Sequence, residues 1–158
     1  MCSITAILNA DAPADELRAA ALSISKRQRH RGPDWSGVFQ HERAVLAHER
    51  LAIVDVTSGA QPLIDSETGT ALAVNGEIYN HNALREHLQR AGALVQPWRG
   101  HSDTETLLAS IEAWGLEGAL ERCFGMFALA LWDRQERRLH LARDRFGEKP
   151  LYWGWLDQ

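Results

Sequence analysis

The segment Phe124-Gly125-Met126-Phe127-Ala128-Leu129-Ala130-Leu131-Trp132 decides the fold, because it is apolar at both its odd and its even positions. Successive side chains of a β-strand point to opposite faces of a sheet, so this pattern predicts a strand buried on both faces. The polar residues 133–137 then predict a hairpin turn, and residues 138–143 the returning strand. We therefore expect an antiparallel sheet that other parts of the chain cover on both faces.

The rest of the chain alternates short apolar runs with helical patterns. Further strands are predicted over residues 3–8, 35–39, 43–54, 70–74 and 151–155. Helices are predicted after Pro13, after Asn82 and after Ser102, ending at the basic run 26–29, at Gly92 and at Gly115. Because the strands form hairpins with helices grouped between them, we expect an α+β protein of two stacked, mainly antiparallel sheets with outer helices.

Composition restricts the classes of function. A chain of 158 residues is one domain, and its formal net charge of −4 provides no basic surface for nucleic acid. The longest apolar run is far shorter than the ~20 residues of a membrane helix, and no signal peptide is expected. Two cysteines form no disulfide framework, which fits a reducing cytoplasm. The seven histidines are scattered, so neither a metal site nor a bound cofactor is expected.

The first two residues, Met1-Cys2, suggest a nucleophile. If Met1 is removed, Cys2 carries a thiol and a free α-amine, and an N-terminal amine can act as the base for its own side chain. Thiols and α-amines in general titrate within about one unit of each other, so the proton can pass between them. A cysteine after the start methionine can also be accidental.

Asn75-Gly76 follows an apolar strand, and no matching return strand comes after it. Such a pair is usually a hairpin turn. On a rigid strand end, however, a glycine amide and an asparagine side chain can donate to one oxygen, which is an oxyanion hole. Four further polar residues have two interpretations each.

Arg50, inside an apolar strand, can bind a carboxylate or lie on the surface. Asp103 can stabilise the start of its helix or receive a substrate ammonium group. Arg31 and Asp34, which flank Gly32-Pro33, can brace a loop over the site or form a solvated turn.

Six ordered motifs resemble the glutamine amidotransferase domain of glutamine-hydrolysing asparagine synthetases, a class II, N-terminal-nucleophile family. The motifs are Met1-Cys2-Ser3-Ile4, Arg29-His30-Arg31-Gly32-Pro33-Asp34, Asn75-Gly76-Glu77-Ile78-Tyr79-Asn80, Ser102-Asp103-Thr104-Glu105, Phe127–Asp133 and Ala142–Tyr152. The resemblance implies a four-layer αββα sandwich. It also implies that this chain is a glutamine amidotransferase domain over residues 1–158, which lacks the last strands and the synthetase domain.

The resemblance also implies roles at the matching positions. Cys2 would attack the side-chain amide of L-glutamine and form a thioester, with Asn75 and Gly76 holding the oxyanion. Arg50 would bind the substrate carboxylate, and Glu77 and Asp103 its ammonium group. The ammonia would pass to a synthetase domain or subunit, where ATP and magnesium are expected, for amidation of aspartate or a related carboxylate.

Departures from the family pattern leave alternatives open. Ser3, Ala6 and Ala47 stand where the family has glycine, and Ser3 would disturb the site if its backbone needed a glycine conformation. A non-catalytic module that binds glutamine or a partner is one alternative. An N-terminal-nucleophile amidase with another amide substrate is the other.

Overall fold

The computed structural model describes residues 1–8 and 11–155. The elements, in chain order, are β1 (Ser3–Leu8), α1 (Ala14–Gln28), η1 (Arg29–Arg31), β2 (Trp35–His41), β3 (Ala44–Arg50), β4 (Leu63–Ile64), β5 (Ala71–Ile78), α2 (His81–Arg90), α3 (Asp103–Arg122), β6 (Gly125–Asp133) and β7 (Arg138–Arg143). The strands form one sheet in the order β1-β3-β2 and a second in the order β4-β5-β6-β7. All the strand pairs in both sheets are antiparallel.

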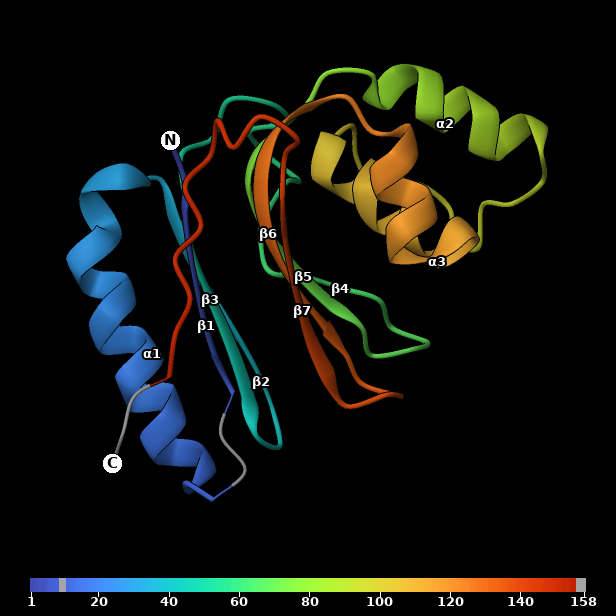
Figure 1. The fold of residues 1–158 in the computed structure, drawn as a ribbon. Coiled ribbons are helices and arrows are strands. Elements are labelled where there is room, and N and C mark those ends of the chain that lie inside the picture. Colours follow the sequence, from blue (N-terminus) through green and yellow to red (C-terminus); the bar gives the residue numbers. More distant parts are fainter. Residues whose placement is uncertain (9–10, 156–158) are drawn as a thin grey trace.

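The two sheets stack face to face between helices (Figure 1). Helix α1 packs on β1 and β3, and α3 packs on β5 with α2 against it, while β1 and β3 contact β5 across the sandwich. This arrangement confirms the predicted αββα layers. None of the helices in the described part of the chain has both the length and the apolar character that crossing a bilayer requires.

Strand β6 is buried on both faces, as its sequence predicts. Ala130 and Trp132 pack between the two sheets, against Leu46 of β3. Leu129 and Leu131 point the other way, into the core that the second sheet shares with α3. The core therefore has separate layers on the two sides of one strand, which is what the doubly apolar pattern requires.

Several predicted boundaries are wrong. The strand predicted over residues 43–54 ends at Arg50, and the strand predicted over 70–74 continues to Ile78, so Asn75 and Gly76 lie inside β5. The predicted last strand over 151–155 is irregular chain with no strand partner among the described residues. The predicted helix end at Gly115 is a kink, because its φ of 71° and ψ of 168° interrupt α3, which resumes as far as Arg122.

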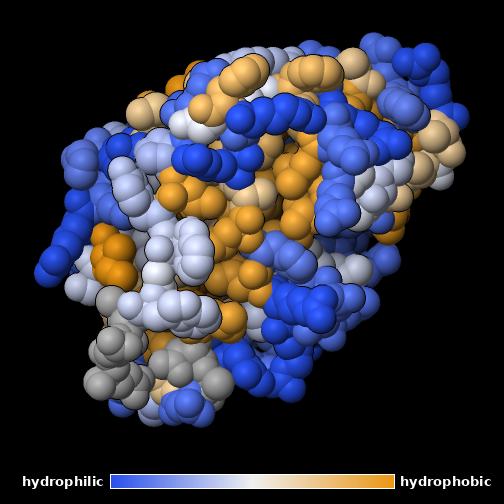
Figure 2. Space-filling model, viewed as in Figure 1, coloured by the Kyte–Doolittle hydropathy of each residue, from blue (hydrophilic) through white to orange (hydrophobic). Residues whose placement is uncertain are grey.

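Apolar surface is exposed on the face drawn in Figure 1. Figure 2 shows apolar side chains gathered in the middle of this face, between the two sheets, with charged side chains around them. The irregular segment after β7 exposes four aromatic residues, Phe146, Tyr152, Trp153 and Trp155. Exposed apolar surface of this kind is typical of contact surfaces.

Candidate active site

One cavity contains the six residues to which the resemblance assigns a catalytic or substrate-binding role. It is lined by Cys2, Arg50, Asn75, Gly76, Glu77 and Asp103, among others. These residues come from the start of β1, the end of β3, the end of β5 and the start of α3. Positions up to 101 residues apart in the chain are therefore brought together by the stacking of the two sheets.

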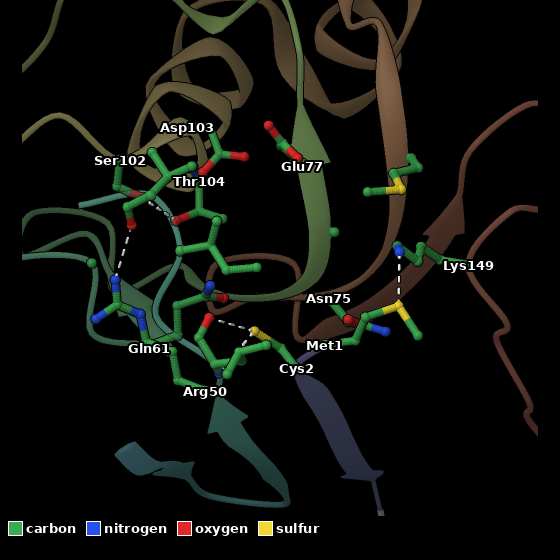
Figure 3. A pocket seen from close by; sticks show the side chains of 16 residues that line it. Met1, Cys2, Arg50, Gln61, Asn75, Glu77, Ser102, Asp103, Thr104 and Lys149 are labelled. Atoms are coloured by element: carbon green, nitrogen blue, oxygen red, sulfur yellow. Dashed lines mark hydrogen bonds between the residues drawn. The ribbon is translucent and has the colours of Figure 1, made fainter. Parts of the chain in front are cut away.

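Cys2 lies just before β1, at one end of this cavity (Figure 3). Its Sγ accepts a hydrogen bond from the Leu51 amide at 3.3 Å and contacts the Leu51 carbonyl at 3.6 Å. The Arg31 Nε donates to the Cys2 carbonyl at 3.3 Å, so Arg31 braces the start of the chain. Ser3 pairs with Glu49 inside β1 and does not have a positive φ, so this position needs no glycine conformation.

Met1 precedes Cys2 in the structure and also lines the cavity. Its sulfur contacts the buried Lys149 ammonium at 3.0 Å (Figure 3). The Cys2 nitrogen is in a peptide bond as long as Met1 is present. Removal of Met1 would turn that nitrogen into the free amine that the proposed base requires.

The backbone of β5 explains how Gly76 faces the site. The Val74 amide donates to Gln61 Oε1 at 2.7 Å, and the Ile78 amide donates to Asp103 Oδ2 at 2.8 Å. Amides two residues apart in a strand point to the same side. The Gly76 amide lies between these two and points the same way, with no such side-chain partner among the described residues.

Position 76 has no room for a side chain. A Cβ added there would lie 2.1 Å from the Met126 carbonyl oxygen and 2.5 Å from the Phe127 Cα, both in the neighbouring β6 backbone. Glycine is therefore required by close packing of two strands. Asn75, one residue earlier, is buried and lines the cavity, so its side-chain amide is a second donor at the same place.

Arg50 is buried at the end of β3, and the loop after it wraps around its guanidinium. The guanidinium donates to the carbonyls of Val54 and Val56, and to that of Asp55. Asp34 holds the same loop, because its Oδ2 accepts from the Ala52 amide at 2.8 Å. Of the two roles open to Arg31 and Asp34, Asp34 thus has the bracing one, whereas Arg31 binds the start of the chain. Arg50 is a loop anchor as well as one of the two cations, with Lys149, that line the cavity.

The acidic side chains gather at the other end of the cavity. Figure 3 shows the Asp103 and Glu77 carboxylates on the same side, across from the Cys2 sulfur. Asp103 is the first residue of α3, preceded by the cap Ser102, whose side chain accepts from the Thr104 amide. One Asp103 oxygen binds β5, as described above, and so holds the helix start against that strand. The cavity therefore has a thiol, amide donors, two cations (Arg50 and Lys149) and, across from the thiol, two anions.

The sequence analysis missed several residues that shape the site. Gln61 and Lys149 line the cavity, and His48 lies behind it with its Nε2 2.9 Å from the Val74 carbonyl. Asp144 is buried and accepts from four amides, those of Phe127, Phe146, Glu148 and Lys149. It thereby folds the loop that carries Lys149. Asp144 and Lys149 lie in the motif Ala142–Tyr152, to which no residue role was assigned. Gln61 and His48 had as their signal only a polar residue beside an apolar run, which is too common to identify a role.

The described residues contain no group of three histidine, cysteine or acidic side chains that could hold a metal ion. Burial raises the pKa of the Cys123 thiol to about 11, so this second cysteine keeps its proton and is a core residue. What the cavity can do chemically thus depends on Cys2 and the groups around it.

Two facing antiparallel sheets lie between helices, and a cysteine leads into the first strand of the first sheet. A solved structure of glutamine phosphoribosylpyrophosphate amidotransferase from B. subtilis has this fold, with a TM-score of 0.68 and 19% identity over 91% of this chain and 37% of that one. A family model described as "Glutamine amidotransferase domain" matches residues 1–158. The chain belongs to this glutamine amidotransferase family.

Curated relatives give the more specific similarity. The chain is 48% identical to asparagine synthetase B [glutamine-hydrolyzing] of Escherichia coli (strain K12) and 46% identical to a probable asparagine synthetase [glutamine-hydrolyzing] of Dictyostelium discoideum. Each match covers 98% of this chain and 27% of the relative. The chain thus spans about a quarter of the length of these relatives and corresponds to their glutamine amidotransferase part.

Proposed function

We propose that this chain hydrolyses L-glutamine to glutamate and ammonia through a thioester on Cys2. The observation that supports this most directly is the shared cavity, in which a thiol faces amide donors and a set of charges suited to a free amino acid. Arg50 suits the substrate carboxylate, and Asp103 with Glu77 suits the ammonium group. These assignments place the side-chain amide of glutamine toward Cys2.

The reaction has two halves. In the first, the α-amine of Cys2 takes the thiol proton while Sγ bonds to the amide carbon, and the oxyanion accepts hydrogen bonds from Gly76 N–H and Asn75 Nδ2. The same proton moves to the leaving nitrogen, the carbon–nitrogen bond breaks, and ammonia departs. In the second half, water adds to the thioester with the amine as base, and glutamate leaves as the thiol is restored.

The ammonia acceptor would be a synthetase domain or subunit outside these residues. The relatives are named asparagine synthetases, so amidation of aspartate or a related carboxylate is the reaction we propose for the complete protein. ATP and magnesium would be needed there, and no cofactor for the glutaminase half. Exposed aromatic side chains after β7 offer a contact surface for that partner. A free Cys2 thiol suits a reducing compartment such as the cytoplasm.

Release of ammonia and glutamate from glutamine by the purified chain starting at Cys2 tests this function. Cys2→Ala should abolish hydrolysis, and a chain that keeps Met1 should be inactive because its amine is blocked. Cys123→Ala is the matched control, since it removes the other thiol from the core and should leave hydrolysis intact. Hydrolysis that survives Cys2→Ala, or that prefers simple amides to glutamine, would contradict the proposal.

A further inference from the structure

We infer that Gln61 and His48 are positioning residues that stand in for a missing strand and hold the oxyanion donors of β5 in place. The inference rests on the proposed function, and it begins with where β4 ends. Strand β4 pairs with β5 only through Leu63 opposite Leu72 and Ile64 opposite Ala71. Beyond that point, one edge of β5 has no strand beside it in the described part of the chain. Gln61 and Asp103, which bind backbone amides along this edge, line the cavity.

Two side chains satisfy the backbone where the neighbouring strand is absent. The Val74 amide donates to Gln61 Oε1 at 2.7 Å, and the Val74 carbonyl accepts from His48 Nε2 at 2.9 Å. A neighbouring strand would provide the same two hydrogen bonds, because it would accept from the amide and donate to the carbonyl of a single residue. Both bonds are buried, so the loss of either one would leave a polar backbone group of β5 unpaired in the core.

The position of these bonds connects them to the chemistry. Val74 immediately precedes Asn75 and Gly76, the two proposed donors to the oxyanion. Gln61 comes from the loop that enters β4, whereas His48 comes from β3 of the opposite sheet. Together they tie β5 to both the cavity loop and the strand that ends in Arg50. A catalytic donor must stay within a few tenths of an ångström of its place, so this tie would matter for rate.

The state of His48 fits this role. A carbonyl can only accept, so Nε2 carries the proton that is shared with Val74. Nδ1 is buried with no partner among the described residues, which suits an unprotonated nitrogen. Burial lowers the pKa of His48 to about 4, with Arg50 and Glu49 as the neighbouring charges, so the ring is neutral when the enzyme works. It is a fixed donor and takes no part in proton transfer.

The test compares two substitutions at Gln61 in the chain starting at Cys2. Gln61→Met keeps the length but removes the acceptor, and kcat for glutamine hydrolysis should fall about ten- to a hundredfold while KM changes little. Gln61→Glu keeps an acceptor for Val74 and should recover most of the rate. Gln28→Met is the matched control, because the Gln28 Oε1 accepts from Thr5 beneath α1 and Gln28 does not line the cavity.

A second readout separates positioning from substrate contact. An aldehyde analogue of glutamine forms a tetrahedral adduct with Cys2 that needs the oxyanion donors, whereas glutamate binds without them. Gln61→Met should weaken the aldehyde in parallel with kcat and leave glutamate binding unchanged. His48→Leu should act like Gln61→Met, and His48→Gln, which keeps an N–H donor, should act less. Unchanged kcat in Gln61→Met, or equal weakening of both ligands, would overturn the inference.

Backbone NMR distinguishes failure of this inference from failure of the proposed function. If the chain releases no ammonia from glutamine, the function is wrong, but the Asn75 and Gly76 amide resonances still report on their position. They should shift and exchange faster in Gln61→Met and stay unchanged in Gln28→Met. Identical Asn75 and Gly76 resonances in Gln61→Met and the parent chain would show that Gln61 does not position them.

Discussion

Gly76 is the residue at which packing and chemistry impose the same requirement. The Gly76→Ala methyl would lie 2.1 Å from the Met126 oxygen and 2.5 Å from the Phe127 Cα, and strand backbone cannot swing aside as a side-chain tip can. We expect β5 and β6 to separate locally, which costs about 1–3 kcal/mol of unfolding free energy. Because the proposed oxyanion donor moves with the strand, glutamine hydrolysis should fall about a hundredfold or more.

The Gly76→Ala prediction is checked by urea denaturation and by initial rates of ammonia release. Gly154→Ala is the control, because a Cβ there has open space and φ is not positive. A Gly76→Ala protein with parental stability would mean that the strands are less tightly packed than the structure shows. Parental activity would remove Gly76 from the oxyanion site.

At the level of single residues, the sequence predicted the residues that would react with or bind the substrate. It missed the residues that hold other groups in place. Asn75-Gly76 was recognisable because no return strand follows it. Gln61 was not, since its acceptor role depends on β4 beginning only at Leu63, two residues later, and on a backbone amide that reaches Gln61 only through folding. Arg50 was predicted as a carboxylate ligand, but its second role as anchor of the loop 54–56 depends on where that loop turns.

At the level of elements, β6 was predictable and the strand ends were not. A run that is apolar at both odd and even positions is satisfied by a strand buried on both faces. The end of β3, by contrast, depends on the loop that wraps around the Arg50 guanidinium. Residues 51–54 are apolar enough to resemble a continued strand, yet the loop carbonyls there are used by Arg50. The segment 151–155 has a strand-like pattern but pairs with no strand of residues 1–8 and 11–155.

The kink in α3 gives a prediction at this scale. Gly115 has φ 71° and ψ 168°, a backbone conformation that is essentially restricted to glycine. Gly115→Ala should therefore destabilise the protein by about 1–3 kcal/mol, even though a Cβ there would have no close neighbour. Gly118→Ala, in the helical part of the same element, should be nearly neutral, because its helix propensity gain offsets a tight 3.2 Å contact with Trp114.

Thermal or urea unfolding of Gly115→Ala and Gly118→Ala shows whether backbone strain or side-chain packing determines the loss of stability. Equal stability of Gly115→Ala and the parent chain would show that the helix can run straight through position 115. Activity should change little in either variant, since α3 contributes to the cavity only through its first turn.

For the whole molecule, the apolar pattern of β6 predicted the stacked layers. It did not predict the contacts that join the two sheets. His48 joins them through the Val74 carbonyl, and its burial has a consequence for stability. Its pKa falls from 6.5 to about 4 in the folded state, chiefly because burial disfavours the charged ring. The unfolded chain therefore binds more protons between these values, and stability is lost as pH falls from about 6.5 toward 4.

Glu112 acts in the opposite direction. Burial first, and then the charge of Asp65, raise the pKa of Glu112 from 4.5 to about 7. Here the folded state holds the proton more tightly than the unfolded chain, so the contribution of Glu112 is complete below about 4.5 and is lost as pH rises through 7. His48 and Glu112 change the unfolding free energy over overlapping pH ranges, so the parent chain alone shows only the sum of the two contributions.

Variants separate the two contributions. Between pH 4 and 6.5, the unfolding free energy of the parent chain should gain on that of His48→Gln by on the order of 3 kcal/mol and then stay level. Relative to Glu112→Gln, the parent should instead lose stability as pH rises from about 4.5 to 7. Urea titrations at half-unit pH steps measure both differences, in which the other carboxylates cancel. A parent-minus-His48→Gln difference that does not vary with pH would mean that the ring can be protonated within the fold, and the neutral link between the sheets would then be excluded.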